Sequence, residues 1–296
     1  MRSLLVCITL IIFLSGCKAQ QKPALKIQPD NNTLLWQVSG KELTKPSYLF
    51  GTFHLLCRDD INFSAQLKSS LMQADEIYME MKMDDPAVLL GGLFYMNMKN
   101  NKTLESLYTP VEYKKINNYF TDTLHTPLTM LGRVKPYFLV ALLYPKMMPC
   151  KTISGVEEEL MKLAKEDKKE IKGLETIQFQ SSVFDSIPYE WQAKELLKNI
   201  DSSAFYKNEF DTMLLVYKQQ KLDDIQKLFT KSEFGDDKYE DILLTQRNKN
   251  WVNQLKLIMK NESVFVAVGA GHLVGEKGLI SLLRKEGYRV DPLVNK

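Results

Sequence analysis

The segment Ser263-Val-Phe-Val-Ala-Val-Gly-Ala-Gly-His272 decides the fold of this chain. Its apolar run, 264–268, is typical of a strand that is buried on both faces of a parallel β-sheet. Parallel strands are joined by crossover connections that are usually helices, so the run predicts an α/β fold. The glycines and the histidine after the run predict a polar side chain at the carboxyl end of the strand, where open α/β sheets bind their ligands.

Other short apolar or aromatic runs predict strands, and periodic apolar positions predict helices. The further predicted strands are 34–38, 47–50, 76–81, 170–174 and 288–290. The predicted helices are 61–74, with Asp59, Asp60 or Asn62 as its N-cap, and 86–98, 127–148, 156–166, 190–199, 204–220, 222–229, 241–259 and 279–283. The apolar stretch 87–96 is only about half as long as a membrane span and predicts a buried helix or a lid.

The composition of the 296 residues, with 45% hydrophobic and 25% charged residues, is that of an ordinary globular protein and excludes a disordered or fibrous chain. The net charge is only +3, and no basic stretch carries interleaved aromatic residues, so we expect no nucleic acid as a partner. The spacing of Gly269, Gly271 and Gly275 does not match the dinucleotide fingerprint. We therefore expect no nucleotide cofactor.

The N-terminus predicts a lipoprotein signal. Arg2 and the apolar run 4–14 have the charge and length of a secretory signal and are too short to span a bilayer. The motif Leu14-Ser-Gly-Cys17 is similar to the lipobox of bacterial lipoproteins, which implies cleavage before Cys17 and acylation of this residue. The alternative is an ordinary signal peptide followed by a chance cysteine. We expect a protein exported to the bacterial cell envelope and anchored in a lipid bilayer, with a signal peptide 1–16, a lipidated tether 17–32 and a single domain 33–296.

Cys57 and Cys150 are the cysteines left in the expected domain once Cys7 and Cys17 are set aside. An exported protein folds where disulfides form, so we expect these two residues to be joined. The alternative is a nucleophilic cysteine, for which the closeness of His54 to Cys57 in the sequence is the only indication.

Two of the three histidines stand in the same context, a hydrophobic strand followed by Gly-x-x-His. Gly51 precedes His54, and Gly269 precedes His272. Glycine at a strand end lets the backbone turn sharply and point the histidine into the crevice, so we expect two half-sites that face each other. The alternative is that each imidazole only bonds to the backbone of its own turn. His125 lies in a turn-like stretch, where we expect it to be solvated.

Landmarks spread over nearly the whole expected domain occur in a fixed order. They are Trp36, Phe50-Gly-Thr-Phe-His54, Ala74-Asp-Glu-Ile-Tyr-Met-Glu80, Gly155-Val-Glu157 with Leu160 and Ala164, Gly173-Leu-Glu-Thr176 with Gln180, Arg247-Asn248 with Trp251, and Val268-Gly-Ala-Gly-His272-Leu with Gly275 and Gly278-Leu-Ile280. Together they resemble the TraB/GumN family, which includes the Tiki-type metalloproteases. The resemblance implies a fold similar to that of erythromycin esterases and ChaN-like proteins. We therefore expect an α/β fold whose central mixed sheet is built from two related halves, with a large helical insertion in the middle of the chain.

His54, Glu80 and His272 provide the nitrogen and oxygen donors that a divalent metal ion takes, and three protein ligands plus water form a catalytic centre. We expect a divalent metal ion of unspecified identity, whose bound water would attack a carbonyl group. Glu157, where the family frequently has Asp, would be a further ligand or a general base. Arg247 would hold a carboxylate or an oxyanion, or would form a buried ion pair with one of the acids. The residues expected to support these side chains are Gly51, Gly269, Gly271, Glu175, Gln180 and Asn248.

Three functions use these residues. The first is a metal-dependent, membrane-anchored hydrolase that cleaves peptide bonds, as the resemblance to Tiki-type proteases implies. The second is a metal-free hydrolase in which a His and Glu pair activates water against an ester, as is proposed for erythromycin esterases. The third is a lipoprotein that binds a ligand or a partner without catalysis. We take the first as the leading hypothesis.

Overall fold

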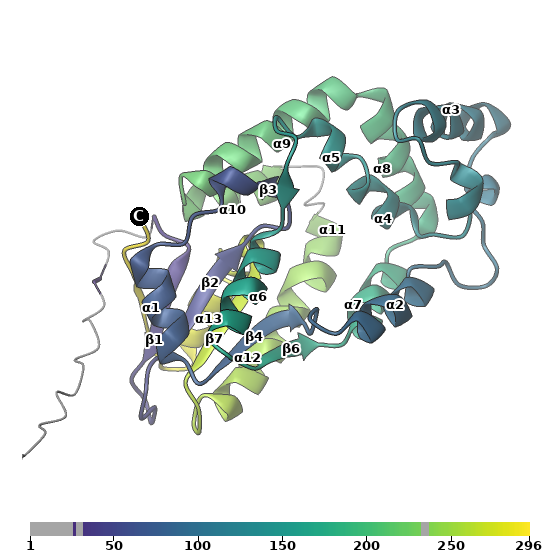
Figure 1. The fold of residues 1–296 in the computed structure, drawn as a ribbon. Helices are drawn as coiled ribbons and strands as arrows, with labels where there is room; N and C mark the ends of the chain where they lie inside the picture. Colours follow the sequence, from purple (N-terminus) through teal and green to yellow (C-terminus); the bar gives the residue numbers. More distant parts are fainter. Residues whose placement is uncertain (1–25, 28–31, 232–236) are drawn as a thin grey trace, which may run out of the picture.

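The computed structural model describes residues 26–27, 32–231 and 237–296, and its centre is a six-stranded sheet (Figure 1). The strand order is β6-β4-β7-β2-β1-β8. The strands span Leu35–Ser39 (β1), Ser47–Thr52 (β2), Glu76–Met81 (β4), Ile171–Glu175 (β6), Val264–Gly269 (β7) and Arg289–Pro292 (β8). β2, β4, β6 and β7 run parallel, whereas β1 is antiparallel to both of its neighbours. The predicted α/β fold with a mixed sheet is therefore confirmed.

β7 lies at the centre of the sheet, between β2 and β4. The side chains of 264–268 are all buried, and the strand pairs in parallel with both of its neighbours. Burial on both faces explains the unbroken apolar run, because successive side chains point to opposite faces and each face is covered. The carboxyl ends of the four parallel strands meet at one edge of the sheet, as the sequence predicts.

Helices cover both faces of the sheet. They are α1 (Ala65–Gln73), α6 (Val156–Glu166), α12 (Gln246–Ile258) and α13 (Leu279–Lys285). In Figure 1, α1 and α6 lie in front of the sheet, and α12 and α13 lie behind it. The predicted N-caps of α1 are wrong, because 58–60 form a separate 3-10 turn and the Ser64 side chain accepts the amide of Leu67 instead.

Most helices from the middle of the chain gather beyond the carboxyl edge of the sheet (Figure 1). The helices of this region are α2 (Pro86–Tyr95), α3 (Pro110–Asp122), α4 (Pro136–Ala141), α5 (Tyr144–Met147), α7 (Ile177–Val183), α8 (Tyr189–Asp201), α9 (Ser203–Lys218), α10 (Leu222–Lys231) and α11 (Asp237–Glu240). The predicted helical insertion is present. α2 leaves Leu90, Leu93 and Phe94 exposed, so it is not the buried helix that we considered.

The single helix predicted over 127–148 is wrong. The segment is divided into a 3-10 turn at Leu128–Leu131 and the two short helices α4 and α5. Pro136 is the first residue of α4 and Pro145 is the second residue of α5, and a residue without an amide hydrogen is tolerated in the first turn of a helix. Each proline therefore suits the start of a helix and cannot continue the one before it.

The predicted disulfide between Cys57 and Cys150 is confirmed, with the two Cα atoms 5.8 Å apart. Cys57 lies in β3 (Leu56–Cys57), which pairs with β5 (Ile153–Ser154) in a small sheet that the sequence did not predict. The bond spans 93 positions of sequence, and a loop of that size lowers the stability of the unfolded state by about 4 to 5 kcal/mol in the chain-entropy model. Because both sulfur atoms are in the bond, neither cysteine is a free nucleophile.

The predicted signal peptide 1–16 and Cys17 lie outside the described residues, as does most of the predicted tether. Near the end of that tether, Ile27 forms a bridge with Leu293, and the amide of Val294 donates to the carbonyl oxygen of Lys26 at 3.0 Å. This part of the tether is therefore joined to the chain just after β8. Within the described ranges, no helix has the length and apolar character needed to cross a membrane.

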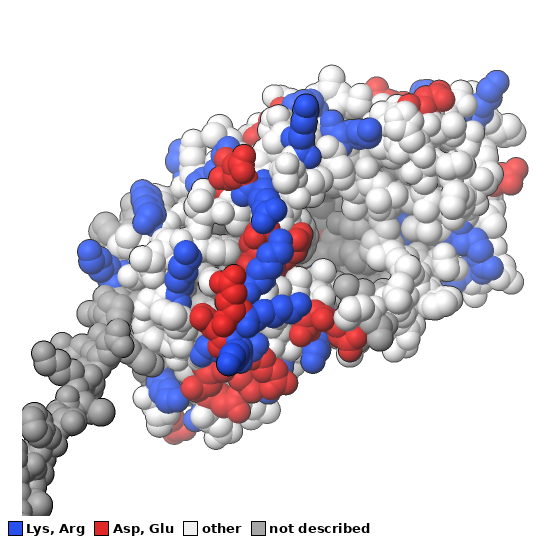
Figure 2. Space-filling model, viewed as in Figure 1, with Lys and Arg blue, Asp and Glu red and all other residues white. Residues whose placement is uncertain are grey.

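Basic and acidic side chains intermingle in a band across the face shown in Figure 2, which passes the position of α6. On α6, Lys162 forms ion pairs with Glu158 at 2.7 Å and with Glu159 at 2.9 Å. At the lower end of the band in Figure 2 the acidic side chains gather into a patch.

Candidate active site

Arg247 is the centre of a buried polar cluster at the carboxyl edge of the sheet. Its Nη2 donates to Glu80 Oε2 at 2.7 Å, and its Nε and Nη2 donate to Glu175 at 3.0 and 2.9 Å. Its Nη1 donates to the carbonyl oxygen of Leu243 at 3.0 Å and lies 3.1 Å from His272 Nε2. The structure thus contains the buried ion pair that we considered for Arg247, with two acids instead of one.

An irregular turn places Arg247 in this position. The five residues Asp241–Thr245 have π-helical geometry and lead directly into α12, whereas the sequence predicted one regular helix over 241–259. Turns of this kind are rare and are frequent at functional sites. The carbonyl group of Leu243 lies in the turn and accepts the guanidinium, so the turn and the cluster support each other.

His272 is buried and neutral. The amide nitrogen of Asn248 donates to the carbonyl oxygen of Lys277 at 2.9 Å, so its Oδ1 faces His272 Nδ1 at 2.6 Å. Nδ1 must then carry the proton, and the lone pair of Nε2 accepts the hydrogen of Arg247. Burial, with the neighbouring charge of Arg247, lowers the pKa of His272 to about 3.

Glu80 reaches the cluster from β4. Its Oε1 accepts the amide of Gly269 at 2.9 Å, and its Oε2 accepts Gln180 Nε2 at 2.8 Å as well as Arg247. Burial raises the pKa of Glu80, but the charge of Arg247 and the hydrogen bond from the Gly269 amide outweigh burial and lower it to about 2. Glu80 is therefore an anion that is held from three sides.

Glu175 ends β6 and closes the cluster on its other side. It also accepts the indole nitrogen of Trp251 at 2.9 Å, and burial raises its pKa against the opposing effect of Arg247. Trp251 also packs against His272 and Arg247. Its ring lies 4.4 Å from the His272 ring and 4.8 Å from the centre of the Arg247 guanidinium. The sequence marked Trp251 as a landmark but assigned it no role.

His54 and Glu157 form a separate pair beside this cluster. Nδ1 of His54 lies 2.8 Å from Glu157 Oε1, and the His54 side chain is 77% exposed whereas that of Glu157 is 11% exposed. The bond and the charge of Glu157 raise the pKa of His54 to about 9, an effect that water weakens because the imidazole is so exposed. Burial raises the pKa of Glu157, but the bond with His54 and the charge of that imidazole outweigh burial and lower the pKa.

Thr52 is a site residue that the sequence analysis missed. It ends β2 and is buried, and its Oγ1 has no hydrogen-bond partner among the described residues. Apart from the ion pair with His54, Glu157 Oε1 has none either. The signal was present in the sequence, because Thr52 stands between the glycine and the histidine of the first Gly-x-x-His motif.

The glycines before the two histidines are needed for close approach and not for the sharp turn that we expected. A Cβ atom at Gly51 would lie 3.0 Å from Leu273 Cδ1, and one at Gly269 would lie 3.2 Å from Glu80 Oε1. Neither glycine is among the described residues with a left-handed backbone. Gly271 is buried in the 3-10 turn that carries His272.

The donors predicted for a metal ion do not fit one in this arrangement. Nε2 of His272 and Oε2 of Glu80 both face Arg247, which already places a positive charge between them. His54 turns its Nδ1 to Glu157 instead. Among the residues that the structure describes, no group of three His, Cys, Asp or Glu side chains is arranged to hold an ion. The ligand set His54, Glu80 and His272 therefore stays a prediction.

A model of the TraB/PrgY/gumN family matches residues 34–292 of this chain. The chain belongs to the TraB/PrgY/gumN family. The match includes both strand ends with their histidines and the whole Arg247 cluster, so the resemblance read from the sequence is confirmed. No solved structure gives a significant match to this member of the family.

A relative of this TraB/PrgY/gumN protein is named metalloprotease TIKI homolog and comes from Amphimedon queenslandica. The two sequences are 23% identical over an alignment of 319 positions that covers 88% of this chain and 62% of the relative. The chain therefore matches less than two thirds of the relative's length. This distant relationship suggests a hydrolase in the family.

Proposed function

We propose that this chain is a hydrolase that activates water at the carboxyl edge of its sheet, with His54 as the general base and Glu157 as its partner carboxylate. The observation that carries the proposal is the pair itself, an exposed imidazole whose Nδ1 lies 2.8 Å from a buried carboxylate. A buried carboxylate orients the ring and stabilises the imidazolium that forms when the base takes a proton. The other ring nitrogen of His54 then faces water and substrate.

The favoured substrate is a peptide bond. The support for this choice is the name of the Amphimedon queenslandica relative, which is a metalloprotease by that name. Arg247 is not assigned to the substrate, because its donors are used by Glu80, Glu175, Leu243 and His272. Its role in the proposal is to hold the charges of the cluster in place beside the His54 pair.

A metal-dependent hydrolase is the second candidate. The relative's name favours it, and so does the unprotonated Nε2 of His272, which is the form that ligates a metal. His54, Glu80 and His272 would be the ligands, and Arg247 would have to give up its contacts with two of them. The two candidates therefore differ in a measurable property, the metal content of the active protein.

The test uses the full chain, purified without a histidine tag and assayed against a mixed peptide library and a panel of esters by mass spectrometry. The first candidate predicts cleavage by protein with less than about one metal ion per ten chains and no loss of activity in EDTA. Stoichiometric metal and loss of activity in EDTA would establish the second candidate and overturn the first. Failure to cleave any substrate, with or without added divalent ions, would overturn both and favour a binding lipoprotein.

We also propose that Cys17 is acylated and anchors the protein to a membrane of the bacterial cell envelope, on the support of the lipobox-like motif ending at this residue. Cys17→Ala is expected to convert a membrane-bound protein into an unprocessed or soluble one, measured by fractionation and by mass spectrometry of the N-terminus. If the protein without this substitution is recovered in the soluble fraction, with its N-terminus after residue 17, the result would contradict the lipid anchor.

A further inference from the structure

Two segments that are far apart in the sequence run side by side next to the candidate active site. One, 53–58, follows β2, and the other, 150–157, leads into α6. The amide of Val156 donates to Phe53 at 3.0 Å, and the amide of Arg58 donates to Thr152 at 3.0 Å. Between these bonds β3 pairs with β5. The two segments therefore form one continuous ribbon.

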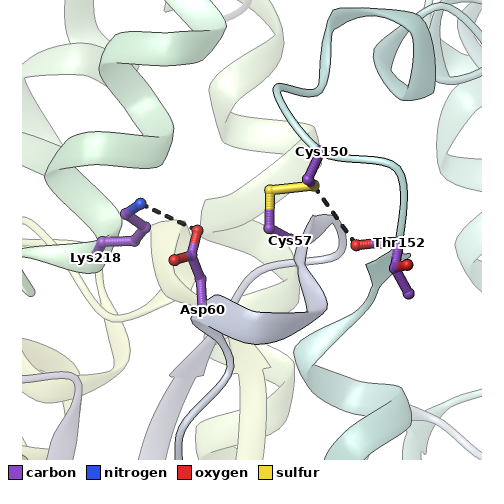
Figure 3. Close-up of a disulfide and its surroundings, with 5 residues drawn as sticks. All are labelled: Cys57, Asp60, Cys150, Thr152 and Lys218. Carbon is purple, nitrogen blue, oxygen red and sulfur yellow. Dashed lines mark hydrogen bonds and ion pairs between the residues drawn. A yellow bond between two sulfur atoms is a disulfide. The ribbon is translucent and has the colours of Figure 1, made fainter.

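The ribbon has a side-chain link at each end. At one end the disulfide joins Cys57 to Cys150, and at the other end His54 meets Glu157. Figure 3 shows the disulfide beside the ion pair of Asp60 with Lys218, whose atoms are 3.0 Å apart. The disulfide is the only covalent link between the two segments among the residues that the structure describes.

The two ends of the ribbon are held differently. Glu157 is buried in the first turn of α6, so packing fixes its position. The His54 side chain is 77% exposed, so little packing holds the imidazole, and its place depends on the course of its backbone. That backbone passes so close to the partner segment that a Cβ atom at Gly155 would lie 2.9 Å from the carbonyl oxygen of His54.

The pairing between β3 and β5 is short. Each strand has two residues, and a two-stranded ribbon of this length is not stable by itself in water. The disulfide lies at the end of the ribbon away from His54. It is therefore placed to keep 53–58 in register with 150–157.

We propose that Cys57 and Cys150 are positioning residues, whose disulfide holds His54 against Glu157. Hydrolysis then depends on these two cysteines being oxidised to the disulfide. The proposal rests on the proposed function for its effect on catalysis. Its structural part, the link between the disulfide and the His54–Glu157 contact, is independent of any activity.

The structural part is tested by the imidazole ¹⁵N resonances of the full chain at a single pH. The chain has three histidines, so each resonance is assigned by one variant. We expect reduction of the disulfide, and the variant Cys57→Ser with Cys150→Ser, to move the His54 resonances to those of a free imidazole while circular dichroism is unchanged. Unchanged His54 resonances would overturn the proposal. Global unfolding after reduction would also overturn it, since the bond would then hold the whole fold.

The catalytic part is tested by a double-mutant cycle. Reduction is expected to lower kcat at least tenfold with little change in KM, because small misplacements of a catalytic group are costly. In Glu157→Gln, which lacks the carboxylate, reduction is expected to have less than a twofold effect. Equal effects in both proteins would contradict positioning through this pair. If hydrolysis does not depend on His54 at all, the proposed function is wrong. The His54 ¹⁵N resonances then still show whether the disulfide maintains the contact of His54 with Glu157.

A matched control separates the disulfide from another attachment of the same turn. Lys218→Gln removes the exposed ion pair with Asp60 and leaves the disulfide intact. Exposed ion pairs contribute little, so we expect unchanged His54 resonances and kcat within twofold of the parent. A loss as large as that caused by reduction would show that any loosening of 58–60 disturbs the site and would overturn a specific role for the disulfide.

Discussion

Replacing Arg247 with methionine is expected to lower the free energy of unfolding by about 3 to 5 kcal/mol, measured by urea denaturation. The variant would leave Glu80 and Glu175 without their shared counter-charge, and both carboxylates are buried. Their remaining donors, Gly269 and Gln180 for Glu80 and Trp251 for Glu175, do not replace a full positive charge. The expected loss of stability therefore comes mainly from two carboxylates without a counter-charge, and not only from the lost hydrogen bonds.

Two further variants check this cause. Adding Glu175→Gln to Arg247→Met neutralises one stranded carboxylate and is expected to recover part of the lost stability. Arg133→Met is the matched control, because Arg133 is exposed and its side chain donates to the neutral Asn101, and it is expected to change stability by less than about 0.5 kcal/mol. A loss below 1 kcal/mol for Arg247→Met would contradict the central place given to this residue.

His54→Ala is expected to lower the rate of hydrolysis by about 100- to 10,000-fold, the usual contribution of a general base. The imidazole is largely exposed and makes no packing contribution of note, so circular dichroism and stability should be nearly unchanged. His125→Asn is the control. His125 is exposed and has a left-handed backbone with φ of 55°, which asparagine tolerates, so this variant should keep full activity. Full activity of His54→Ala would make that histidine structural.

The pH dependence of the rate of hydrolysis is a second test of His54 as the general base. A general base must be unprotonated, and Glu157 raises the pKa of His54 from 6.5 to about 9. The rate of hydrolysis should therefore rise with pH, with a midpoint between these values because water screens the exposed ring. In Glu157→Gln the midpoint should move down toward 6.5, whereas Glu157→Asp keeps the carboxylate and should retain a raised midpoint. A profile that falls with pH over this range would contradict the role of base.

The sequence predicted which side chains end the strands, but not which of them meet. The apolar run 264–268 and the two Gly-x-x-His motifs place His54, His272 and Glu80 at one edge, because parallel strands share their carboxyl edge. Which of these side chains meet depends on the order of the strands in the sheet. The periodicity of apolar residues carries no information about that order. β7 lies next to β4, so His272 lies near Glu80, with Nε2 and Oε1 3.7 Å apart. His54 follows β2 on the other side and meets Glu157 on α6 instead.

The cluster around Arg247 could not be predicted for a similar reason. The sequence allowed Arg247 either a substrate or a buried acid as partner, and only distances decide between them. The deciding feature is the π turn at Asp241–Thr245, whose pattern of residues looks like regular helix. Proline positions, in contrast, carried information that the analysis did not use, since Pro136 and Pro145 mark the helix starts within 127–148.

The strand order also decides when this molecule can acquire its structure. β7, at the centre of the sheet, is the last but one strand to be synthesised, and its pairing with β2 joins residues more than 200 positions apart, such as Tyr48 and Phe265. A nascent chain that stops before 264 has β2 and β4 with bare edges on either side of a missing strand, which are prone to pair with other chains. Of the strand pairs that the structure describes in this sheet, such a chain has only β1 with β2 and β4 with β6. The complete sheet must therefore wait for nearly complete synthesis, and the slow formation of such distant contacts leaves the unfinished chain open to chaperones and to aggregation in the meantime.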